Sequence, residues 1–287
     1  MRRKFQVSNG YLLETEQLAQ VLTLLAERRD AAKVSRHDLM EGTGLSNRQI
    51  ESLVSIGSAM GLVKRGAQVL TDAGWTVMMH DTFLEQKGTL EWCHYMGAGG
   101  FTNLIWYETF NSIFRNSGPL SKDGWTNSLR ELLQNQYTEK TLKKHLREEV
   151  KFISDAYSVR NFRRLSILSQ SSDEKFFVRR YARPEPLVFC SILYHFAVIS
   201  GRNVLQIRDL VDTPGAPGVV FYIDEAIMCR LAEELHGSGW IRYETTHNLN
   251  QIRIKDGYQW LEFLTAHYEG REPRVDSSPG LLRGMSE

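Results

Sequence analysis

Four basic side chains recur at a spacing that places them on one side of a helix. They follow at i, i+4, i+7 and i+11: Lys140, Lys144, Arg147 and Lys151. At a rise of about 1.5 Å per residue the four charges align over about 16 Å. Such a run is usually only a solvated face, but residues 139–183 hold 12 basic and 6 acidic side chains and include Arg163 and Arg164. Because lysine and arginine bind phosphates, we predict that these six cations contact duplex DNA.

A second set of candidate DNA-binding side chains lies near the N-terminus. Ser46 and Gln49 have the S-x-x-Q spacing of a capping box and begin a helix after a glycine-containing turn. Asparagine and arginine in the first turn of such a helix suit base edges, and basic side chains of a hairpin suit phosphates. The predicted contacts are Arg36, Asn47, Arg48, Ser52, Lys64 and Arg65. Glu51 shares the outward face with Ser52 and Ser55, so a protein-docking role is the alternative.

The elements that would position this second set follow the order of a winged helix-turn-helix unit. Apolar residues at helical spacing and N-cap residues predict the helices, and a short alternating pattern around Gly66 predicts the hairpin. The helices are 16–28, 36–41, 47–60 and 72–79, and the hairpin joins 62–65 to 68–70.

The C-terminal third repeats this order with the opposite charge. Its expected elements are helices 185–200, 205–211, 225–236 and 257–268, with a hairpin of 240–243 and 251–254. Three carboxylates lie on the helix in the recognition position, against a lone Arg230: Glu225, Glu233 and Glu234. Carboxylates repel a phosphate backbone, so we predict that this helix binds a partner protein and not DNA.

Aromatic residues are dense between the two units, in residues 81–137. Trp106, Phe110 and Phe114 recur every four residues, which favours one buried helix face over a base-stacking surface. The predicted fold is therefore mainly α with small β-wings, in which two winged helix-turn-helix units flank a helical middle domain. The expected boundaries are 1–80, 81–183 with its basic segment 139–183, 184–268, and a flexible tail 269–287.

Catalytic, cofactor and metal sites are not expected. The 287 residues are 42% hydrophobic with a net charge of +1, values typical of a folded chain, and the three cysteines are too far apart in sequence for a zinc-finger spacing. Neither a nucleotide-binding nor a hydrolase motif occurs. Cys93 and His94 are neighbours that point about 100° apart on a helix. Without a signal peptide or a long apolar run, the expected location is the cytoplasm, with no membrane contact.

Four short stretches carry a family resemblance: Leu70–Gly74, Asp81–Glu85, Thr89–Tyr95 and Trp106–Asn111. They resemble the bacterial domain-of-unknown-function family 4007, which has a leading winged-helix-like segment, an L-E-D-x-x-T-L-W-x-x-H-Y stretch and a W-Y-x-x-F-N stretch. The chain departs from that pattern at its opening residues 5–10 and at Gln86–Gly88. Members occur beside genes for sulfur-incorporating DNA modification and phage defence. The resemblance implies a non-catalytic partner in such a system and provides no catalytic residues.

Two functional hypotheses of different classes follow. In the first, the protein is a DNA-binding accessory component that contacts duplex DNA through the N-terminal unit and the central helix, and other defence proteins through the C-terminal unit. In the second, it is an adaptor without nucleic-acid contact, and both terminal units are docking modules. A transcriptional regulator is a third class, for which no ligand pocket or dimerisation helix is evident in the sequence.

Overall fold

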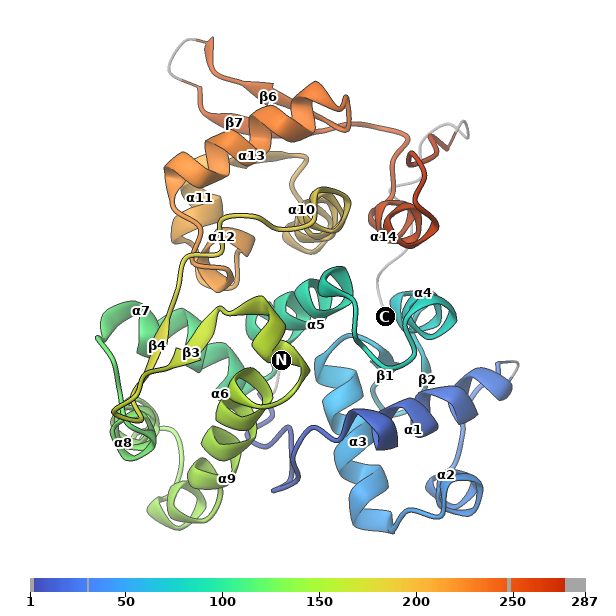
Figure 1. Cartoon of the computed structure of the whole chain (residues 1–287), viewed down its shortest axis with the longest axis vertical. Helices are drawn as coiled ribbons and strands as arrows, with labels where there is room; N and C mark the ends of the chain where they lie inside the picture. The colour runs from blue at the N-terminus through green and yellow to red at the C-terminus, as the bar shows by residue number, and fades with distance from the viewer. Residues whose placement is uncertain (1–2, 30, 247–248, 277–287) are drawn as a thin grey trace.

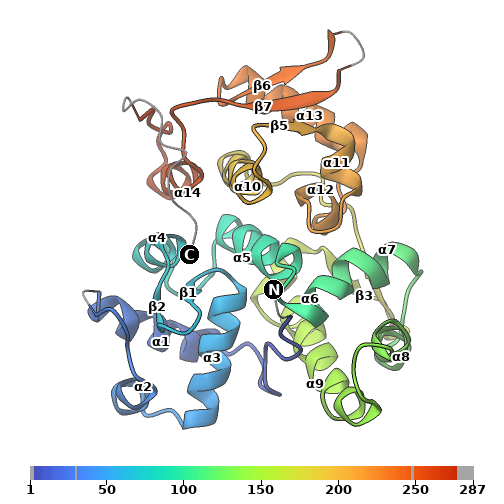
Figure 2. The same ribbon diagram turned by 180° about the vertical axis from the view of Figure 1, so that it is seen from behind.

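The computed structural model describes residues 3–29, 31–246 and 249–276. The described residues are 57% helical, with small antiparallel sheets of two, two and three strands, so the prediction of a mainly helical fold is confirmed. Figure 1 shows the N-terminal and middle parts side by side in a lower tier and the C-terminal part above them. The same two tiers are visible from behind in Figure 2.

The N-terminal elements form where the local signals placed them. Ser35 and Ser46 each close a capping box, with Asp38 and Gln49 as the respective partners. The hairpin pairs Val63 with Leu70 in an antiparallel register. The elements are α1 (Thr15–Glu27), α2 (Arg36–Thr43), α3 (Asn47–Ala59), β1 (Val63–Lys64), β2 (Val69–Leu70) and α4 (Asp72–His80).

The middle part contains more regular structure than expected. Trp106, Phe110 and Phe114 are buried, as their spacing predicted. The segment after residue 158, for which no element is predicted above, contains a 3-10 helix and a short hairpin whose strands pair Leu168 with Val178. The elements are α5 (Lys87–Gly99), α6 (Leu104–Glu108), η1 (Thr109–Ile113), α7 (Phe114–Asn116), α8 (Lys122–Leu133), α9 (Glu139–Ser158), η2 (Asn161–Leu165), β3 (Leu168–Gln170) and β4 (Phe176–Val178).

The C-terminal part corrects one expectation. The predicted helix 205–211 begins as a strand. Leu205 is buried while Val204 and Gln206 are not, which is the alternation of a strand with one face on the core. This strand pairs with β7 in a sheet of order β5-β7-β6. A helix follows from Ile207. The elements are α10 (Pro186–Ser200), β5 (Val204–Gln206), α11 (Ile207–Asp212), α12 (Pro217–Val220), α13 (Glu225–Gly237), β6 (Ile241–Glu244), β7 (Gln251–Ile254) and α14 (Trp260–Glu269).

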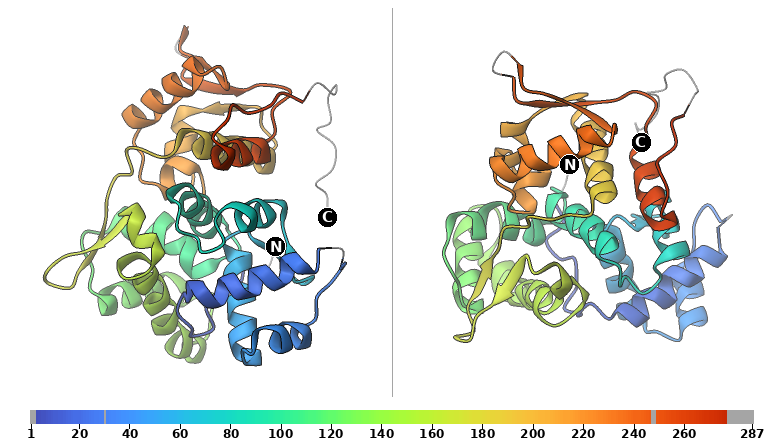
Figure 3. Two further views of the ribbon diagram at one scale, coloured as in Figure 1. Left: turned by 45° about the vertical axis from the view of Figure 1, so that its right-hand side comes forward. Right: turned by 45° about the horizontal axis from the view of Figure 1, so that its top comes forward.

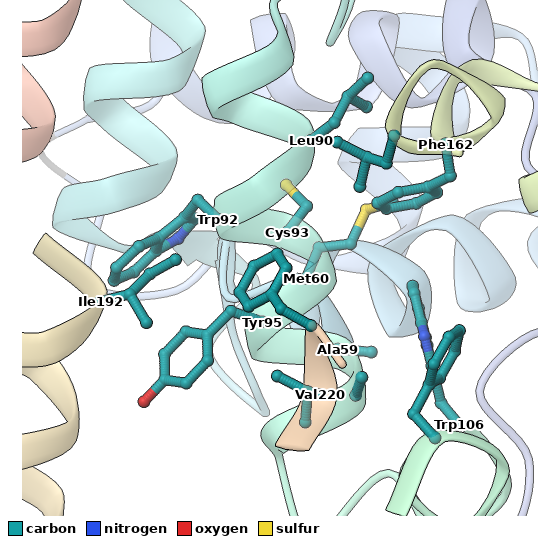
Figure 4. Close-up of a cluster of buried hydrophobic side chains, with 14 of the residues drawn as sticks. Ala59, Met60, Leu90, Trp92, Cys93, Tyr95, Trp106, Phe162, Ile192 and Val220 are labelled. Atoms are coloured by element: carbon teal, nitrogen blue, oxygen red, sulfur yellow. The ribbon is translucent and has the colours of Figure 1, made fainter. Parts of the chain in front are cut away.

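Helix α5 lies at the centre of the molecule and joins the two tiers. Figure 4 shows Trp92, Cys93 and Tyr95 of α5 among side chains from α3, α6, η2, α10 and α12. The ring of Trp92 stacks on that of Trp260 in α14, with centroids 4.9 Å apart. Because the same apolar cluster extends through all three predicted units, packing against α5 fixes their relative positions. The predicted boundaries between units stay a prediction.

Residues 271–276 follow α14 and contact it. The guanidinium of Arg271 lies 2.5 Å from the carboxylate of Glu262, and the backbone N–H of Asp276 donates to the carbonyl of Gly257. The left view of Figure 3 shows α14 beside α4, where the rings of Tyr268 and His80 stack. The predicted tail beyond Asp276 lies outside the described residues. Within the described ranges, no helix combines the length and the hydropathy that a membrane crossing requires.

Candidate nucleic-acid interface

The predicted basic face of α9 is present and open to solvent. Thr138 caps the helix, and the opposite face buries an apolar stripe at helical spacing, including Leu142, Leu146 and Val150. All four cations are exposed: Lys140, Lys144, Arg147 and Lys151. Arg147 forms an exposed ion pair with Asp123 at 3.5 Å, whereas the three lysines form no ion pair with any residue that the structure describes. An exposed pair contributes little, so all four charges are available to a ligand.

A buried carboxylate on α9 holds the N-terminal segment. Glu149 is 1% exposed and accepts hydrogen bonds from the backbone N–H groups of Val7 and Ser8, at 3.1 and 3.0 Å, and from the Ser8 hydroxyl at 2.7 Å. Burial raises the pKa of the Glu149 carboxyl, and the hydrogen bonds from Ser8 and Val7 oppose that change. Residues 4–10, which we call the N-terminal strap, are therefore fixed to α9.

The other side of the strap is fixed to α3. The Ser55 hydroxyl donates to the Val7 carbonyl at 2.6 Å, and the Ser52 hydroxyl donates to the Ser8 carbonyl. Ser52 and Ser55 are 0% and 6% exposed, so the prediction that both face outward is wrong. The strap packs on this face of α3, where its buried carbonyl groups accept hydrogen bonds from the two serine hydroxyls. Ser52 is removed from the candidate DNA-binding set.

The strap and the basic face lie on opposite sides of α9. Glu149 follows Lys140 by nine residues, and each residue turns the helix by about 100°, so the two side chains point about 180° apart. The strap lies between α9 and α3, which places the N-terminal unit behind the cations. Figure 1 shows α3 and α9 at the lower edge of the molecule, with the N-terminal segment between them. The two predicted basic surfaces therefore do not form one continuous face.

The remaining N-terminal candidates are exposed. Asn47 and Arg48 occupy the first turn of α3, and Lys64 and Arg65 lie at the turn of the hairpin. Arg36 forms an ion pair with Glu51 at 3.6 Å, with both side chains about half exposed.

A basic residue that the sequence analysis passed over lies behind these candidates. The Lys4 ammonium donates to the Ser55 hydroxyl at 2.5 Å. Burial lowers the pKa of Lys4, and the nearby Arg65 lowers it further.

Arg163 and Arg164 are exposed but belong to η2, beyond the C-terminal end of α9. The Arg164 guanidinium donates to the backbone carbonyl of Glu85. The two arginines line a surface hollow together with Val159, Arg160 and Asn161. They are therefore placed beside the segment between α4 and α5, on a surface of their own.

The three predicted partner-binding carboxylates are exposed on α13. Glu225 accepts a hydrogen bond from the side-chain amide of Asn250 at 3.0 Å, and Glu234 lies 4.0 Å from Arg230. Glu233 forms no ion pair with a described residue. Two of the three carboxylates thus have an exposed polar partner within the chain, and all three remain accessible to solvent.

A second buried carboxylate anchors the entry to the C-terminal part. Glu91 of α5 is 0% exposed; it accepts a hydrogen bond from the Tyr181 hydroxyl at 2.5 Å and from the Glu185 backbone N–H at 2.9 Å. The Lys87 ammonium lies 3.6 Å away. Burial raises the pKa of Glu91 to about 7, and the hydrogen bonds and Lys87 oppose the shift. The sequence alone does not indicate this contact, because Tyr181 and Glu185 follow Glu91 by 90 and 94 residues.

Cys93 and His94 are both buried in the core, and neither is exposed to solvent. His94 Nε2 lies 2.8 Å from the Val220 carbonyl, so Nε2 carries the proton and Nδ1 accepts from the Tyr157 hydroxyl. Burial lowers the pKa of His94 to about 4, which keeps the ring neutral at pH 7. Both ring nitrogens of His94 are therefore hydrogen-bonded inside the protein.

One cluster of potential metal ligands occurs among the described residues, and it lies on the surface of α2. Ligand atoms of His37, Asp38 and Glu41 lie within 4.8 Å of one another. The Asp38 carboxylate already accepts hydrogen bonds from the Ser35 N–H and hydroxyl, which lower its pKa. Because the capping box uses this carboxylate, we assign no ion to the cluster.

Known proteins share this architecture. The chain resembles a crystal structure of magnesium ion-bound SspB with a TM-score of 0.76 and 15% identity, over 96% of this chain and 90% of that chain. A second SspB crystal structure gives a TM-score of 0.74 with the same identity and coverage. None of the curated proteins compared with the chain matches it. The family model described as a protein of unknown function, DUF4007, matches residues 56–268, and the chain belongs to that family.

Proposed function

We propose that the protein is a non-catalytic, DNA-contacting component of a cytoplasmic system that modifies bacterial DNA with sulfur in defence against phage. SspB, which has a similar fold, is a DNA phosphorothioation-associated protein. The family resemblance, now supported by the match over residues 56–268, implies the same association. In this proposal the units at the two ends of the chain are winged helix-turn-helix units that are joined through the helical middle.

The observation that carries the proposal is the exposed face of α9. Three lysines that form no ion pair with a described residue and one arginine line this face, while the rest of the helix is held by core packing and by the strap. A rigid row of cations about 16 Å long can follow a phosphate backbone, and the release of counterions from the DNA favours binding. Asn47, Arg48, Lys64 and Arg65 provide a second, separate contact.

The acidic surface of α13 is the proposed contact for a partner protein. Its carboxylates repel DNA, so a duplex held on α9 leaves Glu225, Glu233 and Glu234 to a partner with basic side chains.

Replacing all four α9 cations by alanine is expected to weaken DNA binding and to reduce its salt dependence. If each cation contacts one phosphate, the slope of log K against log salt becomes less steep by up to about 3.6. The measurement is fluorescence anisotropy of a 30-base-pair duplex of random sequence, titrated at several salt concentrations.

A matched control removes four other exposed cations, each of which is ion-paired with an acidic neighbour: Lys175, Arg202, Arg208 and Arg242. This control changes the net charge by the same amount and is expected to keep the slope of the wild type. Equal losses in the two variants would mean that only net charge matters. No binding of the wild type at low salt would favour the adaptor hypothesis.

The non-catalytic part of the proposal has its own test. Supercoiled plasmid incubated with the purified chain and Mg²⁺ is expected to stay supercoiled, as it does without the protein. The magnesium ion in the crystal structure of SspB makes this the informative metal to add. Nicked or linear plasmid that disappears with a chelator would overturn this part and leave the DNA-contact proposal intact.

A further inference from the structure

Two segments that are far apart in the sequence form one surface between α4 and η2. The Asn161 side-chain amide donates to the backbone carbonyls of Phe83 and Leu84, at 3.1 and 2.8 Å. Arg164 contacts the neighbouring Glu85 through both the backbone carbonyl and the carboxylate. We call residues 82–85 together with 159–164 the junction surface. It belongs neither to the α9 cations nor to the α13 carboxylates.

The junction surface exposes apolar side chains beside two hollows. Phe83 is 54% exposed and Val159 is 65% exposed, although hydrogen bonds hold the backbone of both segments. One hollow, of about 430 Å³, is lined by Val159, Arg160, Asn161, Arg163 and Arg164. The other, of about 580 Å³, lies between Phe83 and the outer faces of α1 and α2. The side chain of Phe83 therefore stands at the rim of a site that a partner side chain can enter.

The charges around Phe83 indicate which class of macromolecule fits. Arg160 is neutralised by Glu14 and Asp155, at 2.8 and 3.0 Å, whereas Arg163 forms no ion pair with a described residue. The second hollow carries the carboxylates of Glu16 and Glu27. A nucleic-acid strand that stacked a base on Phe83 would bring its phosphates close to these carboxylates, which costs Coulomb energy. A protein segment can place one acidic group on Arg163 and an uncharged side chain on Phe83.

We propose that the junction surface docks a protein segment in which a large apolar side chain has one acidic residue on the side that faces Arg163. The apolar group packs on Phe83 and Val159, and a carboxylate binds Arg163, with Arg164 released from Glu85 as a second donor. Exposed aromatic and arginine side chains beside a hollow are typical of the residues that dominate binding at protein interfaces. This assignment takes Arg163 and Arg164 from DNA contact to partner contact and does not depend on the proposed DNA binding.

A peptide-display selection on the full chain tests the proposal. Peptides selected from a random 12-residue library are expected to share an apolar residue with Asp or Glu nearby. Their affinity, measured by anisotropy, is expected to fall at least tenfold with F83S and at least tenfold with R163E. A peptide with its acidic residues changed to lysine is expected to bind R163E better than it binds the wild type. The control variant I199S/R208E changes an exposed apolar residue and an exposed arginine elsewhere and is expected to bind like the wild type.

Three outcomes would overturn the proposal. They are a selected consensus without acidic residues, equal binding by F83S and the control variant, or tight binding of oligothymidylate that F83S abolishes. If a variant does not fold, hydrogen exchange of the wild type with and without the selected peptide decides: protection is expected in residues 82–85 and 159–164. Because F83S leaves the α9 cations unchanged, its duplex binding is expected to match that of the wild type, so failure here is distinguishable from failure of the DNA proposal.

Discussion

Replacing Glu149 by alanine is expected to destabilise the protein by about 3–5 kcal/mol, because it leaves several buried donors without an acceptor at about 1–3 kcal/mol each. Those donors are the N–H groups of Val7 and Ser8 and the Ser8 hydroxyl. The same change frees the strap from α9, so hydrogen exchange of residues 4–10 is expected to rise even under conditions in which the rest of the chain stays folded. Denaturant unfolding and hydrogen exchange measure the two effects.

The neighbouring residue gives a matched control. Glu148 precedes Glu149 on the same helix and carries the same charge, but its side chain is 48% exposed, lies 3.5 Å from His145 and accepts a single long, exposed hydrogen bond of 3.4 Å from the Gln6 side chain of the strap. Glu148→Ala is expected to change stability by less than about 1 kcal/mol. Glu149→Gln retains a carbonyl acceptor and is expected to fall between the two alanine variants. Equal stability of the two alanine variants would contradict the role assigned to the strap.

The parts of the fold that could be predicted from the sequence are those set by local signals. Ser35 and Ser46 satisfy free N–H groups within three residues, so the sequence alone identifies where α2 and α3 begin. The stripe from Leu142 to Tyr157 on α9 likewise depends only on helical periodicity.

Elements that depend on a distant partner were missed or misassigned. β5 has only three residues and acquires its hydrogen-bond partners from β7, nearly 50 residues later. β3 and β4 are also three residues each, too short for an alternating pattern to stand out.

The candidate site shows the same division. The exposure of Lys140, Lys144, Arg147 and Lys151 followed from the helix period, whereas the burial of Ser52 depends on a strap that crosses α3 from 44 residues away. The position of Glu149 in the sequence does indicate that its carboxylate is buried. It falls about half a turn from the four cations, at the edge of the apolar stripe, where a carboxylate needs buried donors. Which donors it meets could not be predicted, since they are 141 and 142 residues distant.

Ionisation of Glu91 is expected to lower the stability of the protein as the pH rises. Burial raises the pKa of this carboxyl from 4.5 to about 7, so between these values the folded chain holds a proton that the unfolded chain has lost. The stabilisation that Glu91 contributes is fully present below pH 4.5 and is lost as the pH rises through 7. A shift of this size corresponds to about 3 kcal/mol, or about 5 °C in Tm for a chain of this length.

Comparison with Glu91→Gln isolates this contribution, because glutamine keeps an oxygen acceptor for Tyr181 and Glu185 but does not titrate. His94 and His195 act in the opposite direction: burial lowers the pKa of each to about 4, so their contributions increase as the pH rises from 4 to 6.5. The expected result is therefore a difference. The Tm of the wild type minus that of the variant falls by several degrees between pH 5 and pH 8. A constant difference across this range would mean that Glu91 stays ionised in the folded protein, with Lys87 and the two hydrogen bonds offsetting its burial.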